Sequence, residues 1–371
     1  MKIQCDREKL WTSFQTAAAV VPARSPKPTL QNVKLNVSSE SATLIATDLE
    51  VGIRVEVQGI EVDVPGEALL PVNRFGPILR ESSDEKLSIE ADPQSCMIRG
   101  KRSEFRLPGA DPQEFPEVAS FSEDKYHEVP ARLMKELIRR TLFATDTESS
   151  RYALGGVLLE IETDKIIAVG TDGRRLAKME GPCQAVGGDT GGDAQTIVPT
   201  RAMQLIERTL SDADAEIQLA ARSNDILIKN PRATIYSRLV EGRFPKWRDV
   251  FPKRENVQTI ELTVGSLFAV LRQASIVTSD ESRGIDFSFG DGLLVLSTST
   301  AEVGQARVEV PISYEGPSID ISLDHRYVAD FLKVLDLEKT FSVELTDSES
   351  AAVFRTEEGY GYVVMPLAKE R

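Results

Sequence analysis

The sequence predicts an α+β fold in which one unit of two helices and about eight strands occurs three times. Three elements recur in the same order at intervals of about 125 residues. They are an amphipathic helix, a pair of strands joined by a short polar turn, and a strand followed directly by a second helix. Agreement of three elements across three copies predicts three domains of one type rather than one large core.

The helices are predicted from apolar residues that recur at helical spacing. The first helix of each copy falls at 7–20, 130–143 and 263–276, and the second at 73–82, 200–210 and 324–335. Strands are predicted where apolar and polar residues alternate, as they do along 51–58. The paired strands with their polar turn lie at 44–57, 167–180 and 294–310.

Proline-bearing connections separate the three copies. They run near 107–118 and 241–256 and interrupt the regular alternation on either side. Domains are therefore expected at 1–126, 127–253 and 254–371. A chain of 371 residues is long enough for two or three such cores.

The composition argues against a membrane protein, a secreted protein and a disulfide-rich protein. No apolar run approaches the roughly 18–20 residues needed to span a bilayer, and the charged N-terminal segment does not resemble a signal peptide. Cys5, Cys96 and Cys183 are isolated and form neither a disulfide framework nor a CxxC pair. These features predict a cytoplasmic protein with no membrane partner.

Catalytic machinery is hard to find in this sequence. His127 and His325 have no second histidine or cysteine at a metal-ligand spacing. The glycine-rich stretch at 187–192 lacks a lysine and follows no apolar run, so it favours a flexible loop over a phosphate-binding loop. We therefore expect no catalytic residue, no metal and no cofactor, and we expect the chain not to be an enzyme.

Charge is unevenly distributed. The formal net charge is −14, yet the six predicted helices carry thirteen basic and only six acidic residues. In the helix at 130–143, Arg132, Lys135, Arg139 and Arg140 share the side opposite the apolar residues. A solvated face explains any single helix, but six helices with the same bias favour one common surface that faces a polyanion.

Six stretches carry a family likeness over essentially the whole chain. They are ATDLE at 46–50, RYALGG at 151–156, GTDGRRLA at 170–177, IVPTRA at 197–202, LVEGRFPKWRDVFP at 239–252 and YVVMPL at 362–367. Together and in order they resemble the bacterial DNA polymerase III β subunit family, the sliding clamps. The resemblance implies a DNA clamp fold, in which a head-to-tail homodimer closes a six-domain ring with helices lining the bore.

The resemblance also implies a function. The ring would encircle double-stranded DNA without sequence preference and act as a processivity factor with no catalytic activity of its own. A ring retained by topology needs few and weak phosphate contacts, which suits a sequence without an aromatic platform for stacking bases. The implied partners are the DNA polymerase III α subunit, the clamp loader, and other polymerases and repair proteins, which would dock short peptide motifs.

Site residues follow from the resemblance position by position. The implied peptide pocket comprises Leu154, Thr171, Gly173, Arg174, Arg175, Leu176, Pro245, Val250, Tyr327, Ala351, Val363, Val364, Met365, Pro366 and Leu367. From the sequence pattern alone, Leu154, Leu176 and Val363 are more readily explained as core residues. Arg174 and Asp249 depart from the family pattern, which has His and a basic residue there, and the tail extends past the usual end as 368–371.

The implied DNA contacts are Arg24, Lys27, Arg151, Tyr152 and Arg201, although a solvated loop explains Arg24 and Lys27 almost as well. The implied ring interface pairs the edge strands at 104–107 and 304–310, with Arg74, Phe105, Ile276 and Val277 beside them. Two other interpretations stay open at this point. One is a three-domain scaffold that binds proteins but not DNA, and the other is a repeat-built enzyme.

Overall fold

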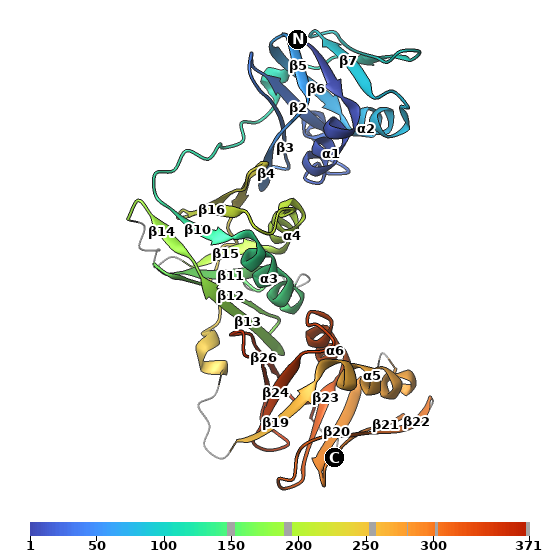
Figure 1. Cartoon of the computed structure of the whole chain (residues 1–371), viewed down its shortest axis with the longest axis vertical. Helices are drawn as coiled ribbons and strands as arrows, with labels where there is room; N and C mark the ends of the chain where they lie inside the picture. The colour runs from blue at the N-terminus through green and yellow to red at the C-terminus, as the bar shows by residue number, and fades with distance from the viewer. Residues whose placement is uncertain (147–152, 189–194, 252–256, 280, 301–302, 369–371) are drawn as a thin grey trace. The chain divides into compact units, whose positions relative to one another are not determined.

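The computed structural model describes residues 1–146, 153–188, 195–251, 257–279, 281–300 and 303–368 (Figure 1). These residues form two compact units. The first unit contains Met1–Lys135 and Cys183–Leu239, and the second contains Glu136–Pro182 and Val240–Arg371. Among the described residues, none of the helices has the length and apolar character required to cross a bilayer.

The first unit contains two antiparallel sheets and the helices α1 (Arg7–Ala18), α2 (Val72–Glu81) and α4 (Thr200–Thr209). The five-stranded sheet has the order β5 (Ile60–Val64), β1 (Lys2–Asp6), β7 (Lys86–Ala91), β8 (Ser95–Arg99) and β9 (Glu104–Pro108). The nine-stranded sheet has the order β14 (Gln184–Val186), β10 (Tyr126–Pro130), β16 (Glu216–Ala221), β17 (Asp225–Lys229), β18 (Ala233–Arg238), β4 (Val51–Glu56), β3 (Ala42–Thr47), β2 (Asn32–Val37) and β6 (Gly66–Pro71).

The nine-stranded sheet is continuous because β4 pairs with β18, from the second copy of the repeat. Ile53 lies opposite Ile235, and both side chains are buried. Helix α1 begins where the Asp6 carboxylate accepts a hydrogen bond from the Lys9 N–H, which is a typical N-cap. Its buried face packs on α2 through Phe14 and Phe75, whose ring centroids are 5.1 Å apart. Apolar burial on alternate strand positions and one helix face thus builds the core.

The second unit also contains two antiparallel sheets. Within this unit, the strands of one sheet follow the order β11 (Gly156–Ile161), β12 (Lys165–Thr171), β13 (Arg175–Pro182), β26 (Gly361–Val364), β25 (Ala352–Arg355), β24 (Thr340–Leu345) and β19 (Gln258–Thr263). The four-stranded sheet has the order β22 (Gly304–Pro311), β21 (Leu293–Thr300), β20 (Gly284–Gly290) and β23 (Ile319–Asp324). Helices α5 (Val264–Ala274) and α6 (His325–Lys333) pack on each other in this unit.

An aromatic cluster fills the core of the second unit. The Phe331 ring on α6 lies 5.2 Å from the rings of Phe341 and Phe354, and 5.4 Å from those of Tyr360 and Tyr362. Such ring pairs contribute about 0.5–1.5 kcal/mol each beyond their burial. The cluster holds α6 against β24, β25 and β26, and thereby fixes the position of β26.

The predicted fold class is confirmed. Each of the six predicted helices is present with both ends within two residues of the prediction; α3 (Ala131–Thr141) replaces 130–143 and α4 is preceded by β15 (Thr196–Pro199). In the described residues the three copies contain nine, nine and eight strands, close to the eight expected. The division at 126 and 253 stays a prediction, because the two compact units do not follow it.

Candidate functional site

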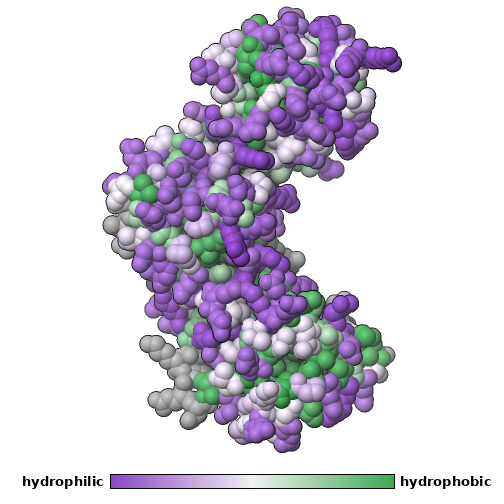
Figure 2. All heavy atoms as spheres, viewed as in Figure 1, coloured by the Kyte–Doolittle hydropathy of each residue, from purple (hydrophilic) through white to green (hydrophobic). Residues whose placement is uncertain are grey.

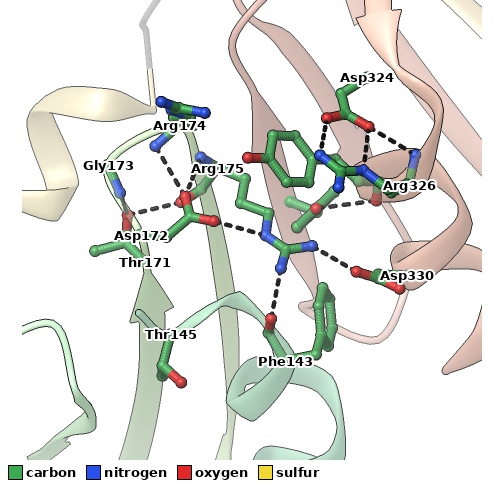
Figure 3. Close-up of polar contacts among 12 residues, drawn as sticks. Phe143, Thr145, Thr171, Asp172, Gly173, Arg174, Arg175, Asp324, Arg326 and Asp330 are labelled. Atoms are coloured by element: carbon green, nitrogen blue, oxygen red, sulfur yellow. Dashed lines mark hydrogen bonds and ion pairs between the residues drawn. The ribbon is translucent and has the colours of Figure 1, made fainter. Parts of the chain in front are cut away.

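A tight turn joins β12 to β13 at 171–175 (Figure 3). The Thr171 hydroxyl donates to the Arg175 carbonyl (2.7 Å) and accepts from the Gly173 N–H (3.1 Å). The Asp172 carboxylate accepts from the N–H groups of Arg174 (2.9 Å) and Arg175 (3.0 Å). Gly173 has φ +85°, a left-handed conformation that glycine adopts without steric cost. The turn is therefore fixed by its own sequence.

Arg175 points from this turn into the protein. Its guanidinium donates to Asp172 (3.0 Å), to Asp330 on α6 (2.7 Å) and to the Phe143 carbonyl (2.7 Å) (Figure 3). It also lies 4.5 Å over the Tyr327 ring, and its side chain is only 10% exposed. Burial lowers the pKa of Arg175, but Tyr362, Asp330 and Asp172 outweigh burial and raise it. Arg175 thus ties the turn to α6 and is not an open lining of a groove.

The last strand, β26, brings the end of the chain to this turn. Arg175 lies opposite Val364 in the ladder, and the Met365 N–H donates to the Arg174 carbonyl (2.9 Å). Beyond β26 the Leu367 N–H donates to the Ser322 carbonyl (2.9 Å), so the chain is held on both sides of Pro366. The Met365 side chain is nevertheless 47% exposed. Backbone hydrogen bonds therefore fix the segment after β26 in a position that leaves the apolar Met365 side chain exposed to solvent.

The connection before β19 contributes a second apolar residue. Helix η4 (Trp247–Val250) is anchored because the Trp247 indole N–H and the Arg248 guanidinium both donate to Glu160 (2.9 Å each). The next residue, Phe251, packs against the backbone of Gly361 on β26. Val250 lies between these two anchors and remains exposed.

The predicted pocket residues divide into two groups. The buried group lies in the core and comprises Leu154, Thr171, Leu176, Ala351, Val363 and Val364. The exposed group comprises Gly173, Arg174, Pro245, Val250, Met365 and Leu367, while Arg175, Tyr327 and Pro366 are half-buried. The buried group can serve as a floor, and the residues accessible to a partner in this conformation are the exposed ones together with Tyr327 and Pro366.

Arg140 departs from the prediction that it belongs to an outward basic face of its helix. Its side chain is buried, pairs with Glu136 (2.8 Å) and Glu358 (2.9 Å), and lies 5.5 Å over the Tyr360 ring. A hydrogen bond from Lys339, together with Arg140, holds the pKa of Glu358 below its usual value despite partial burial. The prediction was wrong because Glu358 and Tyr360 are more than 200 residues away in sequence.

The predicted DNA contacts differ in their surroundings. Arg24 and Lys27 are exposed in the loop after α1, and neither forms an ion pair within the described residues. Arg201 instead pairs with Asp48 (2.5 Å) and donates to the Val20 carbonyl (2.8 Å). Arg151 and Tyr152 lie outside the described residues. Arg201 is thus already engaged within the first unit.

The predicted interface strands lie at sheet edges, β9 in the first unit and β22 in the second. Phe105 on β9 is exposed, as are Arg74 on α2 and Ile276 after α5, while Val277 is half-buried. Sequence reasoning missed exposed Val303, which immediately precedes β22, and Ile78 on α2. Figure 2 shows apolar surface over the part of the second unit that carries α5 and β22. An apolar residue beside an edge strand was the available signal for Val303.

The described ranges contain no cluster of three or more His, Cys, Asp or Glu residues placed to hold a metal ion.

Three family models match the chain in order: the DNA polymerase III beta subunit N-terminal domain at 1–119, its central domain at 128–246 and its C-terminal domain at 248–368. The chain belongs to the DNA polymerase III beta subunit family, the β sliding clamps. It is therefore an accessory subunit, a processivity clamp of DNA replication.

Relatives and solved structures agree with this family. The beta sliding clamp of Pseudomonas putida is 31% identical over 376 residues, covering 99% of this chain and 100% of the relative. That of Escherichia coli is 28% identical, with 99% and 100% covered. The Pseudomonas aeruginosa clamp bound to griselimycin is 29% identical with a TM-score of 0.92, covering 99% of each chain. The Bacillus subtilis clamp, 22% identical with a TM-score of 0.93 and complete coverage of both chains, shows the same fold.

Proposed function

We propose that two copies of this chain close head-to-tail into a ring around duplex DNA, in the cytoplasm, and tether the replicative polymerase to its template. The observation that carries the proposal is the position of the exposed apolar side chains. Phe105, Ile276 and Val303 lie on or beside β9 and β22, the unpaired edges of their sheets. Exposed apolar edge strands invite pairing with another chain, and two different edges give a head-to-tail contact.

A cleft beside β9 supports this interface. It has a volume of about 740 Å³, and its lining includes the apolar residues Ile78 and Phe105 and the basic residues Lys101 and Arg102. Ile276, 75% exposed, is an apolar side chain that such a cleft could bury. We propose that Ile276 and Val277 of one copy pack against Phe105 and Ile78 of the other, with Arg74 nearby on α2. Burying one isoleucine stabilises the contact by roughly 1.5–3 kcal/mol.

The charge of the helices supports a DNA-facing bore. With the observed bounds the six helices carry thirteen basic and five acidic residues, although the chain as a whole is strongly acidic. Among them, Arg132, Lys135 and Arg208 are exposed and form no ion pair within the described residues. We propose that these cations, with Arg24, Lys27, Arg151 and Tyr152, contact phosphates weakly enough to permit sliding.

We propose that partners dock on the surface formed by Met365, Leu367, Val250, Pro245 and Arg174. We name this the docking surface. We propose that the buried group forms its floor, which comprises Leu154, Thr171, Leu176, Ala351, Val363 and Val364. Burial of one or two ligand side chains supplies roughly 2–6 kcal/mol before ordering costs, which suits partners that must exchange. The partners are the DNA polymerase III α subunit, the clamp loader, and other polymerases and repair proteins.

Loading on circular DNA tests the ring. The purified chain is loaded onto a nicked circle with a clamp loader and ATP, and the circle is then linearised. A topologically held clamp stays on the circle and runs off the linear form, as gel filtration of the DNA-bound fraction measures. Equal retention on both forms would contradict the ring, and failure to load would favour the scaffold interpretation.

Met365→Ala is expected to weaken binding at the docking surface. Griselimycin is the probe, because a related clamp has been crystallised with it. Loss of a contacting methionine should raise its Kd about 10-fold or more by isothermal titration calorimetry. Leu337→Ala is the matched control, since Leu337 is a 59% exposed apolar residue of the same unit outside the surface. Equal affinity of the two variants would place the ligand elsewhere.

A further inference from the structure

The turn at 47–51 in the first unit repeats the turn at 171–175 in the second, bond for bond. The Thr47 hydroxyl donates to the Val51 carbonyl (2.8 Å) and accepts from the Leu49 N–H (2.9 Å). The Asp48 carboxylate accepts from the N–H groups of Glu50 (3.0 Å) and Val51 (2.7 Å). Leu49 has φ +82° where Gly173 has +85°. Position 51 is thus the structural counterpart of position 175.

The strands that follow the two turns are also equivalent. β4 pairs with β18 as β13 pairs with β26. Past the ladder, the Arg238 N–H donates to the Glu50 carbonyl (2.9 Å), just as the Met365 N–H donates to the Arg174 carbonyl (2.9 Å). The equivalence therefore extends from the turn into the sheet.

The two units differ in which residue joins the turn to the neighbouring segment by hydrogen bonds. In the second unit Arg175 itself reaches Asp172 (3.0 Å) and the Phe143 carbonyl (2.7 Å). In the first unit the counterpart is Val51, which can make neither bond. Arg201, from α4, makes both instead, to Asp48 (2.5 Å) and to the Val20 carbonyl (2.8 Å). Both carbonyls lie just after the first helix of their copy.

A small cavity in the first unit lies beside Val51, the counterpart of Arg175. It has a volume of about 120 Å³ and is lined in part by Val20, Val51, Arg201 and Leu205. A longer side chain at position 51 would extend into this space, as Arg175 does in its own unit. In both units a guanidinium binds the aspartate of the turn and a carbonyl just after the first helix. In the second unit this guanidinium comes from the strand after the turn, and in the first unit it comes from α4.

We propose that Arg201 is a positioning residue that holds the end of α1 and the loop after it. The Arg201 side chain is 51% exposed, but its partner Asp48 is only 11% exposed, and the same guanidinium also binds the Val20 carbonyl, so its position is fixed by two acceptors. Val20, whose carbonyl Arg201 binds, directly precedes the loop at 21–27 that carries Arg24 and Lys27. The assignment of those two residues to DNA rests on the proposed function, but the tie to Val20 does not.

The rate of trypsin cleavage after Arg24 reports how firmly Arg201 holds Val20 and the loop that follows it, and the assay needs no DNA. Arg201→Ala is expected to speed this cleavage about tenfold, because the base of the loop opens more often. Arg208→Ala is the matched control, since Arg208 is an exposed arginine of the same helix with no ion pair in the described residues. Arg201→Lys keeps the charge but cannot bind both acceptors as a fork, so it should resemble Arg201→Ala.

The decisive experiment moves the arginine from position 201 to position 51, the counterpart of Arg175, and asks whether slow cleavage returns. Val51→Arg combined with Arg201→Ala should restore slow cleavage, because an arginine at 51 can reach Asp48 and the Val20 carbonyl. Val51→Leu in the same background fills volume without a guanidinium and should not restore it. Wild-type cleavage in Arg201→Ala or Arg201→Lys, or equal rescue by leucine and arginine, would overturn the proposal. A failure of the ring would leave these outcomes unchanged.

Discussion

Ile276→Asp is expected to convert the dimer into monomers. Ile276 is 75% exposed in the single chain, so the substitution should leave the fold and its melting temperature unchanged. In the proposed dimer, the same position would bury a carboxylate against Phe105 and Ile78 without a partner. Loss of the apolar contact and burial of the charge together weaken each of the two contacts by about 3–5 kcal/mol, or roughly 150- to 4,000-fold in Kd per contact. Sedimentation velocity over a concentration series measures this shift.

Leu337→Asp provides the matched control. It introduces the same charge at another exposed apolar position of the same unit and should leave the dimer intact. A dimer that persists in Ile276→Asp would contradict the proposed interface, whereas monomers in both variants would show a general effect of charge.

The head-to-tail arrangement makes this prediction sharper. Phe105→Asp and Ile276→Asp each damage both interfaces of a homodimer. Mixed together, the two variants should form a dimer with one intact and one doubly damaged interface. That dimer should sediment normally but be retained on circular DNA less well than wild type. Full retention by the mixture would show that closure does not depend on these two residues.

The helices and strands could be predicted because their cause is local. Apolar spacing alone places every helix end within two residues, as α4 (Thr200–Thr209) against 200–210 illustrates. The edge positions of β9 and β22 are confirmed as well, because each follows its hairpin partner and then leaves the sheet. Each of these features depends on neighbours in sequence, which a periodic pattern records.

The surroundings of the arginines could not be predicted in the same way. Helical spacing puts Arg140 beside Arg139, but Glu358 and Tyr360 bury only Arg140. Family likeness implies a pocket role for Arg175 and a DNA contact for Arg201, but it does not reveal that each guanidinium binds an aspartate and a backbone carbonyl inside its own unit. Such contacts join segments far apart in sequence, and no local pattern encodes them.

Arg175→Ala should destabilise the second unit more than any exposed substitution. It removes the shared partner of Asp172, Asp330 and the Phe143 carbonyl, together with a guanidinium stacked on Tyr327. Breaking a buried ion pair on one side costs about 3–5 kcal/mol. Asp330 retains Lys333 at 3.0 Å, so the lower end of that range is expected. The midpoint of thermal unfolding for this unit should fall by about 6–12 °C, measured by calorimetry.

Arg174→Ala is the control that separates stability from docking. Arg174 is adjacent in sequence but exposed, and its side chain has no ion-pair partner in the described residues. Its loss should change the unfolding free energy by no more than about 0.5 kcal/mol. Arg175→Ala should weaken griselimycin binding as well, because the turn that holds Met365 through the Arg174 carbonyl loses its tie to α6. An unchanged melting temperature in Arg175→Ala would refute this role, because the Phe143 carbonyl would lose the hydrogen bond from Arg175 and Asp172 and Asp330 would each lose one donor.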